Sequence, residues 1–147
     1  MEQQSHDPAF DQLVERAQAA VERFVSGDAA PFAALWSHRP DVTIFGAFGT
    51  PQRGWAEVRS RMAWAAARAV PAAGAVTFEE LSRGVSGDLA YTIWLERSER
   101  RVGAEGRAPV VLRATHLFRR EAEGWRIIHR HADPIISSTA ATAVLQR

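Results

Sequence analysis

The chain has 147 residues, the length of one domain, with 18 basic and 17 acidic residues and no cysteine. This near-neutral charge gives no electrostatic reason to expect nucleic acid or a membrane as a partner. The lack of cysteine excludes disulfides and thiolate metal sites, and the lack of lysine excludes Schiff-base chemistry.

The N-terminal stretch MEQQSHDPAF lacks the basic and apolar segments of a secretory signal peptide. No apolar run approaches the ~20 residues that a membrane-spanning helix needs. We therefore expect a cytoplasmic protein.

Helix and turn signals divide the first half of the chain. Asp7 and Pro8 form a helix start, because aspartate caps free backbone N–H groups and proline suits the first helical turn. Gly27 ends this helix, since glycine tolerates the left-handed backbone that often follows a last turn. The expected elements are a helix over 8–27, a short helix after Asp28 that carries Phe32, Leu35 and Trp36, a strand over 41–45, a turn-rich segment over 46–54 and a helix over 55–69.

The second half of the chain predicts a β-meander. Its four expected strands cover residues 75–83, 89–101, 109–120 and 124–133. Helices first and antiparallel strands next give an α+β order. We expect a single domain over residues 1–147, with its core at about 8–135 and a flexible or accessory tail at 136–147 that can add one helical turn.

The element order and the stretches DVTIFG, RGWAEV and THLFRREAEGWRIIHRHADP resemble the SnoaL-like branch of the NTF2-like superfamily. The resemblance covers about residues 8–135. It implies a ketosteroid isomerase-like, cystatin-like cone fold, in which N-terminal helices pack on a curved, mainly antiparallel sheet and enclose a pocket. Such domains are usually dimers. The fold does not settle function, because the superfamily holds enzymes, binding modules and association domains on one scaffold.

Side-chain alternation predicts the direction of the histidines near the C-terminus. The inward residues expected for the last strand are Trp125, Ile127, His129, His131 and Asp133. If Arg120 pairs with Trp125, His116 of the preceding strand lies opposite His129. We therefore expect the three histidines and Asp133 to form one patch on the apolar face. Arg113, Arg126 and Arg130 are expected on the outer face, where the resemblance implies a second subunit.

Three interpretations of this patch stay open. Imidazoles and a carboxylate are metal ligands, but an H-x-H pair is a weak signal because any strand places such residues on one side. The same groups can perform acid/base chemistry if an apolar pocket moves their pKa values toward neutrality. The third interpretation is a packed polar layer, for which His116 is the best candidate.

Large apolar side chains are expected to line the pocket. The predicted ligand-binding residues are Trp36, Phe45, Trp55, Met62, Trp94, His116 and Trp125. In the second strand of the meander we expect Ala90, Thr92 and Trp94 to point inward. Trp64 lies off the apolar stripe of its helix, so it is expected at the pocket rim or in a contact across a dimer.

We expect the pocket to bind a small hydrophobic molecule without a metal or a cofactor. For an enzyme, the resemblance implies isomerisation, cyclisation or hydration of a polyketide-, steroid- or terpene-like compound. The predicted catalytic residues are His129 or His131 as general base, oriented by Asp133, with Asp41 a weaker candidate. The alternative is a non-catalytic ligand-binding or oligomerisation module.

Overall fold

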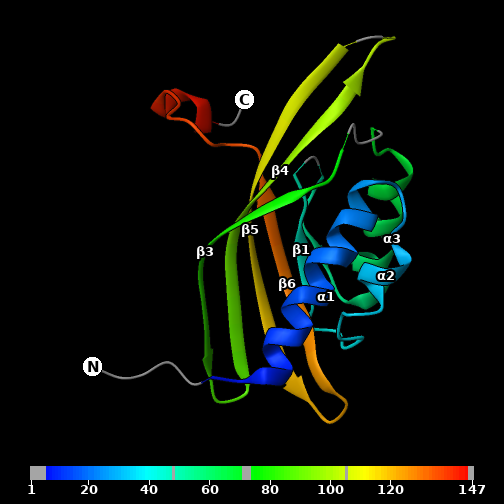
Figure 1. Cartoon of the computed structure of the whole chain (residues 1–147). Helices are drawn as coiled ribbons and strands as arrows, with labels where there is room; N and C mark the ends of the chain where they lie inside the picture. Colours follow the sequence, from blue (N-terminus) through cyan, green and yellow to red (C-terminus); the bar gives the residue numbers. More distant parts are fainter. Residues whose placement is uncertain (1–5, 48, 71–73, 105, 146–147) are drawn as a thin grey trace.

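In the computed structural model, which describes residues 6–47, 49–70, 74–104 and 106–145, three α-helices lie on one face of a six-stranded sheet (Figure 1). The helices are α1 (Pro8–Val25), α2 (Ala30–Ala33) and α3 (Trp55–Ala67), and a 3-10 turn, η1 (Ala141–Val144), follows the sheet. The strands are β1 (Thr43–Phe45), β2 (Gln52–Arg53), β3 (Thr77–Ser86), β4 (Leu89–Val102), β5 (Gly106–Glu121) and β6 (Gly124–Asp133). Residues 1–5 of the N-terminal stretch MEQQSHDPAF lie outside the described residues.

The sheet order is β2-β1-β6-β5-β4-β3. β1 runs parallel to β6, whereas the other neighbouring strands are antiparallel. The expected class, an α+β cone with N-terminal helices on a mainly antiparallel sheet, is therefore confirmed. Within the described residues, no helix combines the length and the apolar character needed to cross a membrane.

Helix α1 forms for the local reasons that the sequence predicts. Its first turn is capped by Asp7, whose carboxylate accepts a hydrogen bond from the backbone N–H of Phe10 at 3.1 Å. It ends one residue before Ser26, and Gly27 follows with φ +109°, a backbone conformation that favours glycine. Its apolar stripe faces the sheet and comprises Phe10, Leu13, Val14, Ala17, Ala20 and Val21, all buried.

The segment after α2 is hydrogen-bonded to strand β6. The expected second helix stops at Ala33, so Leu35 and Trp36 lie beyond it. Two backbone hydrogen bonds, both 2.9 Å long, join this segment to Ile127. The N–H of Ile127 donates to the carbonyl of Leu35, and the carbonyl of Ile127 accepts from the N–H of Ser37. These bonds fix the helical layer against β6.

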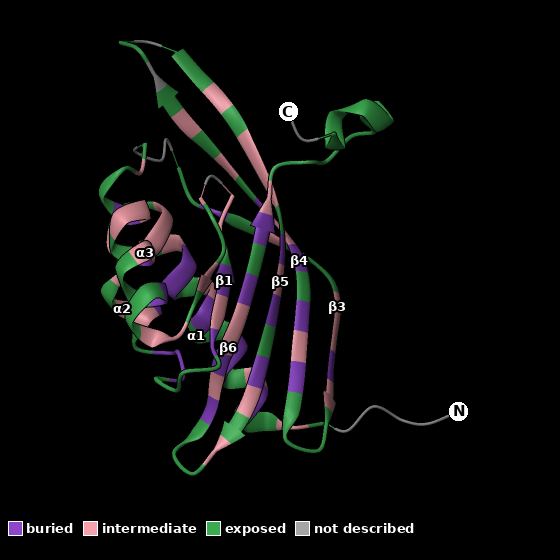
Figure 2. Ribbon diagram, turned by 180° about the vertical axis from the view of Figure 1, so that it is seen from behind, coloured by how far each residue is buried: buried purple, intermediate pink, exposed green. Residues whose placement is uncertain are grey.

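The hydrophobic core fills the space between α1, α2 and the inner face of the sheet. Buried and exposed positions alternate along β4, β5 and β6 (Figure 2). Phe118 lies at the centre of this layer and meets Phe10 edge to face, with ring centroids 5.0 Å apart. The inward direction expected for Ala90, Thr92 and Trp94 is confirmed, since all three are buried.

A β-bulge reverses the direction expected for the second half of β6. The expected pairing of Arg120 with Trp125 is confirmed. Further along, Phe118 pairs with Ile127 but Leu117 pairs with His129, so β6 contains one extra residue, Ile128.

The consequence is a change of face for every residue after the bulge. Arg130 and Ala132 turn inward and are buried. The prediction that His129, His131 and Asp133 share the inner face is wrong, as is the outward direction predicted for Arg130. The physical reason is that a single inserted residue shifts the two-residue alternation of a strand by one.

Substitution of Ile127, which is fully buried, tests how much the bulged hairpin contributes to stability. Ile127→Ala should lower the free energy of unfolding by about 2–5 kcal/mol, because it removes buried methyl groups and leaves a cavity. The matched control is Ile136→Ala, at an exposed position after β6, which should change stability by less than about 0.5 kcal/mol. Urea denaturation measures both variants, and an equal loss in the two would contradict this view of the core.

Candidate functional site

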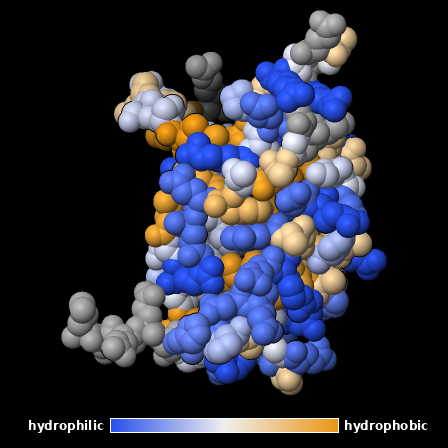
Figure 3. All heavy atoms as spheres, in the orientation of Figure 1, coloured by the Kyte–Doolittle hydropathy of each residue, from blue (hydrophilic) through white to orange (hydrophobic). Residues whose placement is uncertain are grey.

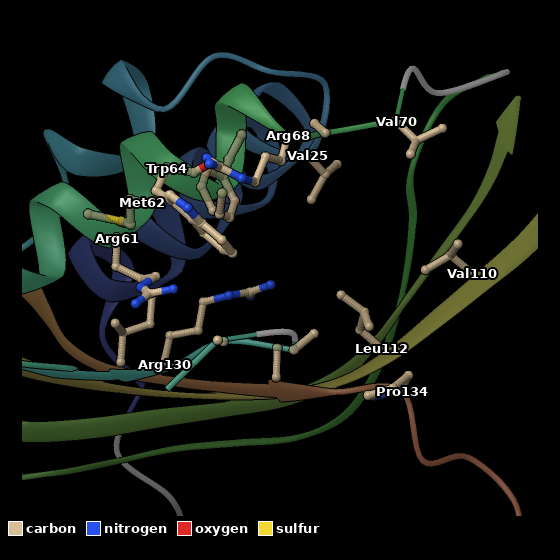
Figure 4. Close-up of a pocket in the computed structure, with 18 of the residues that line it drawn as sticks. Val25, Arg61, Met62, Trp64, Arg68, Val70, Val110, Leu112, Arg130 and Pro134 are labelled. Atoms are coloured by element: carbon tan, nitrogen blue, oxygen red, sulfur yellow. The ribbon is translucent and has the colours of Figure 1, made fainter. Parts of the chain in front are cut away.

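A cavity of about 410 Å³ lies between α3 and the inner face of the sheet (Figure 4). Its walls come from the end of α1, from β1 and the segment after it, from α3, and from β4, β5 and β6. The apolar lining residues include Phe24, Val25, Ile44, Met62, Trp64, Ala65, Val70, Val110, Leu112, Ala132 and Pro134. The cavity is therefore mainly hydrophobic.

Beneath the cavity, Glu96 and Arg130 form a buried ion pair. The two guanidinium nitrogens Nη1 and Nη2 of Arg130 donate to Oε2 and Oε1 of Glu96 at 2.8 and 2.9 Å, and both side chains are 3 % exposed. Trp94 donates its indole N–H to Oε2 of Glu96 at 2.8 Å. Burial alone would raise the pKa of Glu96, but the Arg130 guanidinium outweighs it and lowers that pKa.

His116 belongs to this buried layer. Its Nε2 lies 3.1 Å from Nη1 of Arg130, and because arginine can only donate, Nε2 must be the acceptor. Burial, reinforced by the Arg130 charge, lowers the pKa of His116 to about 3. The ring is therefore neutral at physiological pH and carries its proton on Nδ1, for which the described residues provide no partner. Of the three interpretations of the histidines, the packed polar layer fits His116.

The other two histidines lie on the opposite face of the sheet. His129 is half-buried, with Nδ1 2.7 Å from the hydroxyl of Thr43 on β1. Phe45 packs its ring against both His129 and His131, with centroid distances of 5.1 and 5.5 Å. Burial lowers the pKa of His129, and the neighbouring His131 lowers it further.

Asp133 is held by an arginine on the same outer face. It accepts two hydrogen bonds from Arg113, at 2.7 and 2.8 Å, and these bonds lower its pKa. His131 Nε2 is 3.4 Å from the carboxylate. Asp41, the weaker catalytic candidate, is paired with Arg119 instead, at 2.6 Å. Within the described residues, no group of three or more His, Asp or Glu side chains is arranged to hold a metal ion.

Among the seven residues predicted to line the pocket, only Met62 does so. Trp36, Trp94, His116 and Trp125 are buried in the core, Trp55 stacks on His38 at 4.2 Å, and Phe45 is on the outer face. The physical reason is that most large apolar side chains fill the core of a small domain instead of lining a pocket. Trp64, expected at the rim or in a dimer contact, does line the cavity.

The charged residues of the cavity, none of which the sequence analysis predicts as ligand-binding, are Arg61, Arg68, Arg100 and Arg130. A signal for Arg130 existed. Glu96 continues the inward series of β4, and a carboxylate at the centre of a sheet requires a buried counter-charge. The adjacent pair Ile127 and Ile128 also interrupts strand alternation, which is typical of a bulge.

The protein is thus a cone-shaped α+β domain with a mainly apolar cavity between its helices and its sheet. Over residues 13–137 the chain matches the family described as SnoaL-like domain, and it belongs to that family. The NTF2-like superfamily expected from the sequence is thereby confirmed. No curated protein matches the chain.

Solved structures with the same fold include proteins of different kinds. A candidate calcium/calmodulin-dependent protein kinase type II association domain from Thiobacillus denitrificans has 22 % identity and a TM-score of 0.70, with 91 % of this chain and 99 % of that chain covered. A ketosteroid isomerase-like protein from Erwinia carotovora has 17 % identity and a TM-score of 0.70, with 90 % and 100 % covered. An NTF2-like protein with a cystatin-like fold from Novosphingobium aromaticivorans has 26 % identity and a TM-score of 0.65, with 95 % and 94 % covered.

The buried ion pair can be tested against an exposed pair of the same chemistry. Glu96→Gln should lower the free energy of unfolding by about 3–5 kcal/mol, because it leaves Arg130 buried without a counter-charge. Asp133→Asn breaks the exposed bidentate pair with Arg113 and should cost less than about 1 kcal/mol. Chemical denaturation of the two variants measures the difference, and similar losses would contradict the assigned role of Glu96.

The lowered pKa of Glu96 predicts how the stability difference between the parent protein and Glu96→Gln changes with pH. The folded pKa of Glu96 lies below its ordinary value of 4.5, so its stabilising contribution is complete above pH 4.5. This contribution is lost as the pH falls through the lowered folded pKa. The stability difference between the parent protein and Glu96→Gln should therefore shrink only in acid, as measured by denaturation from neutral pH downward.

Proposed function

We propose that this chain binds a small, largely hydrophobic molecule in the cavity between α3 and the sheet. The single observation that supports this most strongly is the cavity itself, with a volume of about 410 Å³ and mainly apolar walls. Small-molecule sites in proteins are usually concave, apolar and roughly 300–1,000 Å³ in volume.

The lining residues favour binding over catalysis. Among the described residues that line the cavity, arginine is the only side chain with an ionisable proton. Its pKa is too high for general acid/base work near neutral pH. The catalytic role suggested for His129, His131 and Asp133 stays a prediction, and the position of these groups on the other face of the sheet does not favour it.

A cavity-filling substitution tests binding. Ala65 lines the cavity from α3, so Ala65→Phe should place a ring in it. The affinity for a neutral hydrophobic dye such as Nile red should then fall by at least about tenfold, equivalent to 1.4 kcal/mol. Dye fluorescence titration measures the change.

Ala67→Phe is the matched control, because Ala67 is exposed on the same helix and does not line the cavity. It should bind the dye as the parent protein does. If the parent does not bind the dye, or if both variants lose binding equally, the cavity is not the binding site.

A second candidate function is self-association through the outer face of the sheet. Leu89, Ile93 and Leu117 are 56 %, 37 % and 41 % exposed. Leu117 pairs with Tyr91, the residue between Leu89 and Ile93 on the same face of β4, so these side chains form a continuous patch. Hydrophobic side chains are exposed on the sheet side of the molecule, at the left of Figure 3.

We infer that this patch binds a second copy of the chain, since contiguous exposed apolar surface often marks a protein interface. The fold similarity to an association domain supports the same view. The resulting homodimer would leave the cavity free, because the patch and the cavity are on opposite faces of the sheet.

A charge in the patch tests the dimer. Leu117→Glu should shift the protein from a dimer to a monomer of 16.2 kDa, because a carboxylate would be buried at the interface without a partner. Light scattering after size-exclusion chromatography measures the mass. Leu145→Glu, at an exposed position beyond the sheet, should leave the dimer unchanged, and a parent protein that is itself a 16.2 kDa monomer would refute the assignment.

A further inference from the structure

The charge of the cavity is unbalanced. Four arginines line it, at positions 61, 68, 100 and 130, and no carboxylate is among the described lining residues. Glu96 lies beneath the cavity and neutralises Arg130, but both of its oxygens are already used by Arg130 and one also by Trp94. Among the described arginines of the cavity, Arg130 alone lies at ion-pair distance from Glu96.

Among the described residues, the hydrogen-bond partners of the other three guanidinium groups are neutral. Within the part of the chain that the structure describes, none of them has a carboxylate at ion-pair distance. Arg61 donates to the hydroxyl of Thr50 at 3.3 Å, and Arg68 donates to the backbone carbonyl of Trp64 at 3.2 Å. Since a guanidinium carries five N–H donors, each of these arginines keeps donors for another partner.

Arg100 shows the same imbalance in a half-buried position. Its Nη1 donates to the backbone carbonyls of Val25 and Val70 at 2.7 and 3.1 Å. Burial lowers the pKa of Arg100, and the attraction of Glu96 offsets only part of this effect. A charge held near an apolar cavity without a counter-ion is unfavourable, and an anion in the cavity would relieve this.

Two of the arginines are held in place by an aromatic ring. The guanidinium carbons of Arg61 and Arg68 lie 4.5 and 4.3 Å from the ring centroid of Trp64. Arg61 is three residues before Trp64 on α3, and Arg68, four residues after it, follows the last residue of that helix. This cation–π contact positions both charges at the cavity wall without neutralising them.

Three of the four arginines lie at one end of the cavity, whereas Arg100 lies beside Val70 at the other end, which is otherwise apolar. Figure 4 shows Arg61, Arg68 and Arg130 together on the side of α3 and Trp64, whereas Val70, Val110, Leu112 and Pro134 lie on the other side. A ligand that fits both ends must itself be amphipathic.

We propose that the ligand is an organic carboxylate with an apolar body, whose carboxylate binds Arg61 and Arg68 beside Trp64 while its body lies against the apolar end. This proposal rests on the proposed function, which is ligand binding in the cavity, and specifies in addition that the ligand carries a negative charge. Arginine suits this role because its planar N–H groups match the two oxygens of a carboxylate.

The test compares two probes of equal shape, 2-naphthoate and 2-naphthamide, by titration calorimetry on the full chain at about pH 7.5, where the acid is ionised. Naphthoate should bind at least about tenfold more tightly than the amide, because charge-assisted hydrogen bonds are stronger than neutral ones. High salt should weaken the binding of naphthoate but not of the amide.

Variants identify the groups responsible. The double variant Arg61→Gln and Arg68→Gln should bring the affinities for the acid and the amide to within about twofold of each other. The control Arg59→Gln changes an exposed arginine of α3 that does not line the cavity, and it should preserve the preference.

The possible outcomes separate the two proposals, and the comparison on the parent protein needs no variant to fold. Equal binding of acid and amide, or tighter binding of the amide, would overturn the carboxylate and leave the cavity as a binding site. Absence of binding by both probes would overturn both proposals.

Discussion

The bidentate ion pair between Glu96 and Arg130 is the interaction on which the interior of this domain depends. The two residues are on β4 and β6, with β5 between them, so the pair connects three strands on their inner face. A desolvated pair of this kind contributes little net stability compared with apolar packing, but loss of one partner is very unfavourable. Its clearest consequence is geometric: Arg130 must point inward.

The inward direction of Arg130 requires the bulge at Ile128. Without the extra residue, the alternation of β6 would bring His129 inward and expose Arg130. The bulge thus assigns different residues to the two faces of the sheet. The inner face receives the ion pair, the neutral His116 and the cavity, whereas the outer face receives His129, His131 and an apolar patch. The proposed ligand binding and the proposed self-association would therefore use opposite sides of one sheet.

Much of the fold could be predicted from local sequence. The start of α1 at Pro8 and the turn at Gly27 follow from capping and backbone freedom, and both are as predicted. The bounds of β6 were also predicted correctly, and the inner faces of β4 and β5 followed from simple alternation. The candidate site was predicted less well: Met62 and Trp64 line the cavity, but the arginines were missed and the histidines were assigned to the wrong face.

By itself, the sequence determined the order of the elements, their approximate ends and the family, because these depend on capping, turns and the periodicity of short segments. Only the tertiary structure decided what the cavity contains. The register of β6 depends on pairing with β5 and with the distant strand β1, and on a counter-charge 34 residues away at Glu96. One inserted residue reverses a strand face, so the identity of the site depends on this long-range pairing.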